Sequence, residues 1–165
     1  MSVFACASIF AAENSVIFKD GFTDFKNWLK NPACEKNDGG GSFEIISGEK
    51  NGTCLKIETN SKQILMLNCK KTFPIPQDGK IQFSFQAKGK GAILFIPMGN
   101  TAKERVYLEQ KEINIDSKDW EKVQFTCTMK DQLGKAFSGE TLNLRMNINP
   151  NSSLMIDDFT VETVK

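Results

Sequence analysis

The chain has 165 residues, of which 40% are hydrophobic and 25% charged, and its 21 Lys and Arg against 20 Asp and Glu leave a formal net charge of +1. This length suits one domain with a substantial core and is too short for two ordinary domains. The chain contains no histidine, which excludes serine–histidine–acid triads, cysteine–histidine pairs and histidine-ligated zinc. The near balance of charge argues against a long-range attraction to nucleic acid or an anionic membrane.

The first twelve residues, MSVFACASIFAA, carry no charge and are small or apolar, and the composition becomes mixed from Glu13 onward. This pattern is typical of the end of a secretory signal peptide, although it lacks a basic start and its apolar stretch is short. We therefore interpret residues 1–12 as a truncated signal peptide and residues 13–165 as one secreted or periplasmic domain. The alternative is a buried first strand. No other stretch approaches the ~20 apolar residues of a membrane span.

Alternation of apolar and polar residues predicts about ten short strands, separated by clusters of Gly, Pro, Asn and Asp. The clearest run is KIQFSFQAK at 80–88, and the pattern returns at 123–129 and 141–149. Further strands are predicted at 15–20, 42–48, 54–59, 62–70, 92–98, 104–109, 112–115 and 154–164. Helical turns are predicted only for Asp24–Lys30 and within the loop 131–139. Short strands without a helical period indicate an all-β, antiparallel two-sheet β-sandwich.

Four cysteines remain once the signal peptide is set aside, namely Cys34, Cys54, Cys69 and Cys127. An even number in an exported chain is compatible with two disulfides, and four cysteines allow three pairings. We predict Cys34–Cys54 and Cys69–Cys127. The alternative is four reduced core thiols, because cysteine is among the most buried residues. No CxxC spacing occurs, which argues against zinc.

Several segments in sequence order resemble the strands of galactose-binding-like jelly rolls, including carbohydrate-binding modules of families 4, 9 and 22. The opening of that fold is matched by FKDGFTDFKNW at 18–28, SFEI at 42–45 and CLKI at 54–57. IQFSFQAK at 81–88 resembles its central strand, DWEKVQF at 119–125 its tryptophan-led strand, and LMIDDFTV at 154–161 its closing strand. The resemblance covers residues from about 15 to 164. It implies a jelly roll of about ten strands, a fold that serves many binding roles.

The resemblance also implies a structural calcium ion that joins the first and last strands. Carboxylates and backbone carbonyls are the oxygen ligands that calcium prefers. The matching positions are Asp20, Asp157 and Asp158, whereas Lys26 stands where the family usually has an acidic residue. The alternative is that Asp157 and Asp158 accept hydrogen bonds at a strand end. Trp28 and Trp120 occupy positions where this fold packs an aromatic, so we assign both to the core.

The binding sheet of this fold usually includes the counterparts of 62–70, 92–98, 104–109 and 141–149. The outward residues predicted on two of these strands are Arg105, Tyr107, Glu109, Asn143, Arg145 and Asn147. An aromatic ring, two planar guanidinium groups and amides that both donate and accept hydrogen bonds suit the recognition of sugar hydroxyls. They include the only arginines and the only tyrosine of the chain. The alternative is an ordinary solvated sheet face, which also needs polar residues.

We therefore predict a non-catalytic carbohydrate-binding module whose few exposed aromatics make it a weak binder of a glycan. The alternative is an exported structural or protein-interaction domain with the same jelly roll, whose partners are other secreted or envelope proteins. A two-carboxylate glycoside hydrolase or lyase needs no histidine. However, the acidic residues are scattered and none forms an evident pair, so no enzyme is predicted, and no cofactor besides calcium.

Overall fold

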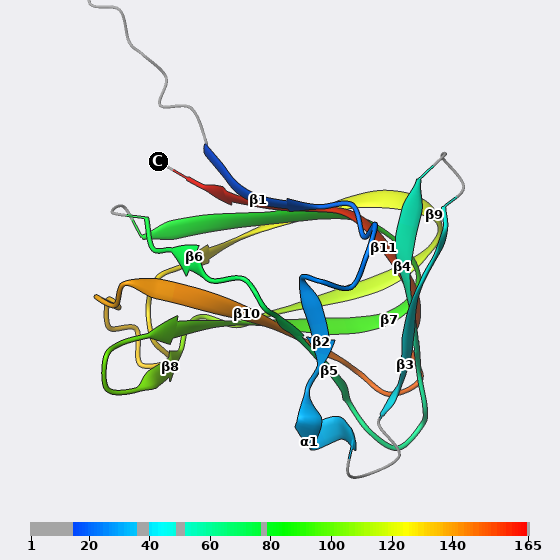
Figure 1. Ribbon diagram of the computed structural model, residues 1–165, viewed down its shortest axis with the longest axis horizontal. Coiled ribbons are helices and arrows are strands. Elements are labelled where there is room, and N and C mark those ends of the chain that lie inside the picture. The colour runs from blue at the N-terminus through cyan, green and yellow to red at the C-terminus, as the bar shows by residue number, and fades with distance from the viewer. Residues whose placement is uncertain (1–14, 36–39, 49–51, 77–78, 165) are drawn as a thin grey trace, which may run out of the picture.

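The computed structural model describes residues 15–35, 40–48, 52–76 and 79–164, and the predicted signal peptide at 1–12 lies outside them. Within these ranges the chain forms an all-β antiparallel sandwich, as predicted, with eleven strands and one short helix (Figure 1). The elements are β1 (Ser15–Asp20), β2 (Trp28–Lys30), α1 (Pro32–Glu35), β3 (Gly41–Ser47), β4 (Thr53–Thr59), β5 (Leu65–Cys69), β6 (Phe73–Pro74), β7 (Lys80–Asn100), β8 (Arg105–Tyr107), β9 (Lys111–Thr128), β10 (Thr141–Ile148) and β11 (Ser153–Thr163).

Strands β7 and β9 are long and bent, and each runs through both sheets of the sandwich. The sequence predicted a break in each of them, between 88 and 92 and between 115 and 123. The structure instead keeps β7 continuous through Gly89 and Gly91, whose φ angles are 115° and 155°. A Cβ atom on Gly89 would lie 2.1 Å from the Ser153 carbonyl oxygen. The glycines therefore let the strand bend where another backbone passes close by.

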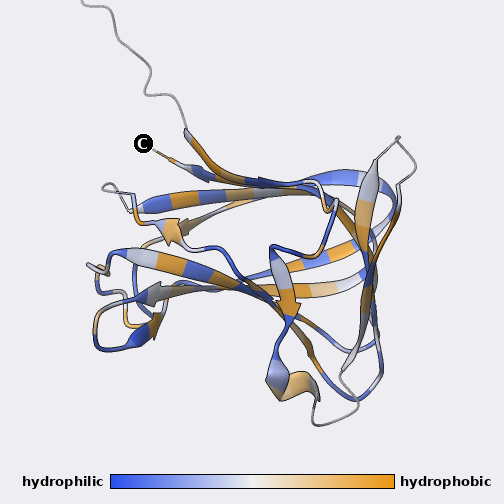
Figure 2. Cartoon of the chain, in the orientation of Figure 1, coloured by the Kyte–Doolittle hydropathy of each residue, from blue (hydrophilic) through white to orange (hydrophobic). Residues whose placement is uncertain are grey.

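The bend divides the strands into two sheets. The first sheet holds β3, β4, β1, β11, the first half of β7 and the second half of β9. The second sheet holds β2, β5, β6, β10, β8, the second half of β7 and the first half of β9. Because side chains alternate along each strand, each sheet turns one row inward and one row outward. Figure 2 shows this alternation as orange and blue bands along β7 and β10.

Phenylalanine rings fill the space between the sheets. Phe95 projects from the second sheet, and its ring centroid lies 5.4 Å from that of Phe85 and 4.9 Å from that of Phe125 on the first sheet. The Phe159 ring of β11 stacks on the Phe95 ring, with 6.3 Å between the two centroids. Tilted and stacked pairs at these separations add about 0.5–1.5 kcal/mol each beyond the burial of their area. These contacts hold the two sheets together.

Local structure between β1 and β5 differs from the prediction. Asp24–Lys30 does not form a helical turn: a tight turn leads directly into β2, where Trp28 lies opposite Cys69 and Lys30 opposite Leu67. Pairing with β5 satisfies the backbone and buries Trp28, so the tertiary contact outweighs the local helical tendency. The loop 131–139 also contains no helix, and Lys130 and Ala136 form an isolated bridge across it.

The predicted disulfides Cys34–Cys54 and Cys69–Cys127 are wrong. No disulfide forms among the four cysteines that the structure describes, and all four are buried thiols. The partners of each predicted pair lie in or against different sheets. Cys34 Sγ accepts from Met66 N of the second sheet at 3.2 Å, whereas Cys54 lies opposite Ile46 in the first. Cys69 lies opposite Trp28 in the second sheet, whereas Cys127 lies opposite Ile81 in the first. Burial raises the pKa of the Cys69 thiol to about 11 and that of the Cys127 thiol to about 12. Both side chains therefore serve as small apolar core residues.

Candidate functional site

The outward row of β10 carries the polar residues that the sequence singled out. Its inward row, Leu142, Leu144, Met146 and Ile148, is fully buried in the core. The alternate residues Asn143, Arg145 and Asn147 are therefore turned to the other side of the second sheet, where they are half-buried. Residues two apart on a strand are separated by about 6.7 Å, so the three side chains form an evenly spaced polar ladder.

Neighbouring strands place further side chains beside this ladder. In the register of the sheet, Asn143 lies opposite Met98, Arg145 opposite Ile96 and Asn147 opposite Leu94. On the other side of β10, Asn68 of β5 lies opposite Arg145. Directly opposite residues in an antiparallel pair project from the same face of the sheet. We call the surface made by Asn68, Leu94, Ile96, Met98, Tyr107, Asn143, Arg145 and Asn147 the arginine–amide face.

The apolar residues of the arginine–amide face form its floor. Ile96 and Met98 keep only 5% and 2% of their surface exposed, yet neither belongs to the core cluster between the sheets. Flanking side chains on the same face therefore cover them. The result is a compact surface in which polar groups stand over a covered apolar base.

Hydrogen bonds hold the polar side chains of this face in place. Arg145 Nε donates to Asn68 Oδ1 at 3.0 Å, which orients the plane of the guanidinium group. Asn100 Nδ2 donates to Asn143 Oδ1 at 2.7 Å, and Asn143 Nδ2 donates to the Lys71 carbonyl oxygen at 3.1 Å. Side chains that are already ordered lose little conformational entropy when a ligand binds.

Asn147 is the exception in this network. Among the buried side-chain polar atoms of the described residues, Asn147 Oδ1 alone accepts no hydrogen bond. Leaving a buried acceptor unsatisfied costs about 1–3 kcal/mol. The amide therefore represents a stability cost that a hydroxyl donor from a ligand would relieve.

Strand β8 brings the only tyrosine to the same face. Tyr107 lies opposite Met98, and Arg105 lies opposite Asn100. Met98 is thus flanked by Asn143 on one side and Tyr107 on the other. The Tyr107 ring is 45% exposed, so it offers an aromatic surface next to the polar ladder. The structure brings together five of the six predicted binding residues on one side of the second sheet.

Glu109 is the predicted binding residue that does not join the others. Strand β8 ends at Tyr107, Leu108 turns into the core, and Glu109 N donates to the Lys130 carbonyl oxygen at 3.0 Å. The Glu109 carboxylate accepts hydrogen bonds from Thr128 N, at 2.9 Å, and from Thr128 Oγ1. These bonds lower the pKa of Glu109. The strict alternation that predicted its position fails because the strand stops two residues earlier.

Sequence reasoning missed two polar side chains of this region: Asn68, which belongs to the face, and Asn100, which donates to Asn143 from beside it. Asn68 was recoverable, because it alternates with the buried residues Leu65, Leu67 and Cys69. Asn100 was harder to find: it follows Pro97 and Gly99, both buried, at the end of β7, where hydrophobicity no longer alternates.

The predicted calcium ligands do not converge. Asp20 is 6% exposed and turned inward, where Oδ1 accepts from Phe22 N at 2.8 Å and Oδ2 accepts from Trp28 Nε1 at 2.9 Å. Asp157 lies opposite Gln86 on the outward side of β11, and Asp157 Oδ1 accepts a hydrogen bond from Asp158 N at 2.7 Å. Within the described residues no three Asp, Glu or Cys side chains form a group that could hold a metal. The geometry therefore does not fit the calcium site, which stays a prediction.

The two tryptophans occupy different environments. Trp28 is in the core, as predicted, and its indole N–H is satisfied by Asp20. Trp120 is only half-buried and lies outside the core cluster, so its assignment to the core is wrong. Lys88 Nζ lies 5.3 Å from the centroid of the Trp120 ring. The side chain lies near the bend of β7 and β9, where the irregular register turns it outward.

Comparison with known proteins identifies the fold. Neither a family model nor a curated protein matches the sequence. Among solved structures, the chain is similar to the CBM22-1 xylan-binding domain from Paenibacillus barcinonensis Xyn10C, with a TM-score of 0.61 and 11% identity over 94% of this chain and 98% of that one. The chain has the jelly-roll fold of carbohydrate-binding modules.

Two further structures share this fold. The family 11 carbohydrate-binding module of cellulosomal cellulase Lic26A-Cel5E from Clostridium thermocellum matches with a TM-score of 0.55 and 16% identity, over 92% of this chain and 95% of that one. The CBM22-1–GH10 modules of a Clostridium thermocellum xylanase, complexed with xylohexaose, match with a TM-score of 0.61 and 12% identity. Here the match covers 92% of this chain and 29% of that one, so the similarity corresponds to part of the enzyme.

In the part of the chain that the structure describes, no helix has the length and hydrophobicity needed to cross a lipid bilayer.

Proposed function

We propose that this protein is a non-catalytic carbohydrate-binding module that binds a glycan on the arginine–amide face. The observation that carries the proposal is the alignment of Asn143, Arg145 and Asn147 on β10 beside an apolar floor and an exposed tyrosine. The carbohydrate-binding modules that share the fold support it.

The face supplies the three kinds of contact that a sugar requires. The Tyr107 ring can pack against the C–H surface of a pyranose, in the way aromatic side chains cover apolar surface. The guanidinium group of Arg145, oriented by Asn68, presents a planar set of donors to ring and hydroxyl oxygens. Asn147 Oδ1 is an acceptor for a sugar hydroxyl, whose hydrogen bond would repair the unsatisfied buried atom.

Binding is weak in this proposal. A single aromatic ring, one charge-assisted hydrogen bond from Arg145 and a few neutral hydrogen bonds, each neutral bond worth about 0.5–1.5 kcal/mol net, must offset the entropy lost on association. The predicted signal peptide at 1–12 supports an exported protein, which places the domain where extracellular polysaccharides occur.

A non-catalytic role follows from the same surface. The arginine–amide face contains no carboxylate, whereas histidine-free glycosidases need two acidic side chains across the scissile bond. The second candidate function is an exported protein-interaction domain. It is favoured by the small number of exposed aromatic residues, since Tyr107 and Phe25 are the only aromatics among the exposed large hydrophobic residues that the structure describes.

Affinity electrophoresis in gels that contain xylan, β-1,4-galactan or mixed-linkage β-glucan tests the proposal. We expect at least one of these neutral polymers to retard the wild-type chain. Tyr107→Ala and Arg145→Ala should each weaken retention about tenfold, which corresponds to the loss of one stacking contact or one charge-assisted hydrogen bond.

Gln124→Ala is the matched control. Gln124 is an exposed amide on β9, and its Nε2 donates to Gln82 Oε1 on the outward side of the first sheet. This variant should migrate like the wild type in every gel. Wild-type migration that no glycan changes, together with capture of a secreted protein that Tyr107→Ala abolishes, would favour the interaction domain instead.

A further inference from the structure

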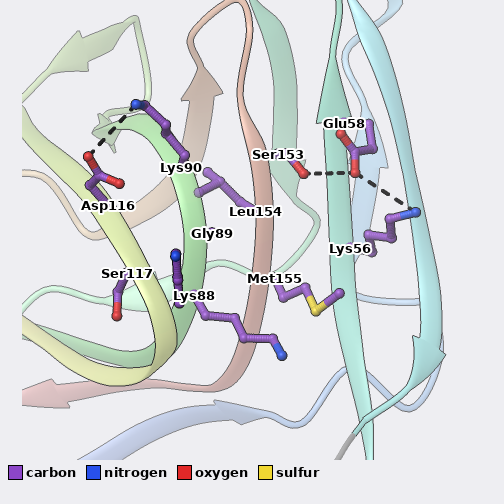
Figure 3. Close-up of a pocket in the computed structure, with 11 residues that line it drawn as sticks. Lys56, Glu58, Lys88, Gly89, Lys90, Asp116, Ser117, Ser153, Leu154 and Met155 are labelled. Carbon is purple, nitrogen blue, oxygen red and sulfur yellow. Dashed lines mark hydrogen bonds and ion pairs between the residues drawn. The ribbon is translucent and has the colours of Figure 1, made fainter.

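A depression lies on the outward side of the first sheet, at the bend of β7 and β9. It has a volume of about 570 Å³ and is lined by Lys56, Glu58, Lys88, Gly89, Lys90, Asp116, Ser117, Lys118, Ser153, Leu154 and Met155 (Figure 3). We call it the lysine depression. It shares no residue with the arginine–amide face, so any role it has is independent of the proposed function.

The register of the sheet arranges these side chains in two rows. One row runs from Glu58 of β4 through Ser153 and Lys90 to Asp116 of β9. In the other row Met155 lies between Lys56 and Lys88. Together the rows cross four strands, and the middle of the depression is floored by Met155 and the bare backbone of Gly89. The Leu154 side chain is buried in the core on the other side of the sheet.

Charge is unevenly distributed in the depression. Four lysines face two carboxylates, although the whole chain carries a net charge of only +1. Lys90 Nζ lies 3.9 Å from Asp116 Oδ2, and both side chains are largely exposed, so this pair contributes little. Lys56 Nζ lies 3.3 Å from Glu44 Oε1 and 3.8 Å from Glu58 Oε1. Counting Glu44, four lysines stand against three carboxylates, and this excess of one positive charge favours an anionic occupant.

The shape of the depression decides between kinds of anion. It contains no arginine fork to grip a phosphate, and its volume lies within the range of about 300–1,000 Å³ that organic ligands occupy. An extended acidic peptide binds by adding a strand to a sheet edge. Here the floor strands β11 and β7 are each paired on both sides. Recognition must therefore come from side chains alone.

The two carboxylates of the depression narrow the choice of anionic ligand further. Glu58 and Asp116 would repel an anionic group placed directly beside them, but they accept hydrogen bonds from hydroxyl groups. Ser153 Oγ, which donates to Glu58 Oε1 at 2.9 Å, adds another hydroxyl-compatible group. Lys88, drawn across the floor in Figure 3, also lies over the half-buried ring of Trp120. Ammonium groups, hydroxyl acceptors and an apolar floor together match a sugar that bears a carboxylate.

We infer that the lysine depression is a second saccharide site, which takes a uronic-acid unit of an acidic polysaccharide. The lysines attract the carboxylate, Glu58 and Asp116 accept from its hydroxyls, and Met155 contacts its ring. Binding is sensitive to ionic strength, because exposed charges separated by more than the Debye length of about 8 Å at physiological salt are screened.

Affinity electrophoresis in gels that contain polygalacturonate tests this inference. We expect the wild type to be retarded at low ionic strength and released by salt. The double variant Lys90→Glu/Lys118→Glu should weaken retention about tenfold, since it reverses two exposed cations of the depression. Retention by the neutral polymer that the wild type binds should be unchanged.

The matched control is Lys70→Glu/Lys135→Glu, which makes the same change of net charge at exposed lysines outside the depression. It should be retarded like the wild type. The inference is overturned if polygalacturonate does not retard the wild type, or if both double variants lose retention equally. It is also overturned if poly-L-glutamate retards the wild type as strongly with the same dependence on Lys90 and Lys118, because the depression would then bind polyanions of any kind.

Discussion

The arginine–amide face and the lysine depression both use the bent strand β7. The depression lies at the bend, around Gly89, and the face lies beyond it, at Leu94, Ile96 and Met98. The face is assembled from short or planar side chains that hydrogen bonds already hold, such as Arg145 on Asn68 and Asn100 on Asn143. The depression is assembled from long, exposed lysines around a methionine floor. Directional hydrogen bonds suit a neutral ligand of defined shape, whereas exposed ammonium groups recognise charge.

This difference implies that the two surfaces respond to different conditions. Neutral hydrogen bonds and ring contacts depend little on ionic strength, whereas the attraction of exposed charges is screened by salt. A ligand of the arginine–amide face should therefore stay bound at salt concentrations that release a ligand of the lysine depression.

The largest expected effect comes from the bend of β7. In Gly89→Ala the new Cβ would meet the Ser153 carbonyl oxygen at a φ of 115°, so we expect a loss of about 3 kcal/mol or more in the free energy of unfolding. Urea denaturation measures it. Gly52→Ala is the control, because nothing lies within 4 Å of its Cβ position, and its stability should stay within about 0.5 kcal/mol of the wild type. Equal stability of the two variants would contradict the account of the bend.

The next largest effect is the pH dependence of stability that comes from two buried thiols. Cys69 lies in the second sheet, which carries the arginine–amide face, and Cys127 lies in the first. Burial raises their pKa values to about 11 and about 12, above the ordinary thiol value of 9.0. Above pH 9 the unfolded thiols lose protons that the folded thiols keep, so stability that is present below pH 9 is lost as the pH rises. For each thiol, the free energy of unfolding falls by about 1.4 kcal/mol per pH unit in this range.

Urea denaturation between pH 8 and pH 11 measures this slope, and Cys69→Ala and Cys127→Ala should each reduce it. The Cys127 contribution extends to higher pH, because its folded pKa is higher. A slope that neither substitution changes would show that the thiols are accessible to solvent in the folded state.

The smallest effect separates binding from stability within the arginine–amide face. Asn147→Leu removes the buried unsatisfied acceptor and keeps the branching of the side chain at Cγ, so we expect stability to rise by about 1 kcal/mol. Retention by the neutral glycan should fall, whereas retention by polygalacturonate should not change. A more stable variant with unaltered glycan retention would remove Asn147 from the binding site.

Much of the fold could be predicted because alternation is a local property of strands. The inward rows of β7 and β10 were recognisable as Ile81, Phe83 and Phe85 and as Leu142 and Leu144, and all of these are buried. The same alternation placed Asn143, Arg145 and Asn147 on the outward side. It could not show that β7 and β9 continue through the bend, because that depends on Ser153 passing close to Gly89.

The residues of the two sites could likewise be predicted in part from the sequence. The chain sequence alone determined which residue types were present and which side of a strand they occupy, since side chains alternate wherever a strand persists. Only the tertiary structure decided which strands are neighbours: it set Asn68 beside Arg145, turned Glu109 toward Thr128, kept the four cysteines apart and gathered the lysines at the bend. Strand register and bends arise from contacts between distant residues, and the local pattern along the chain does not encode these contacts.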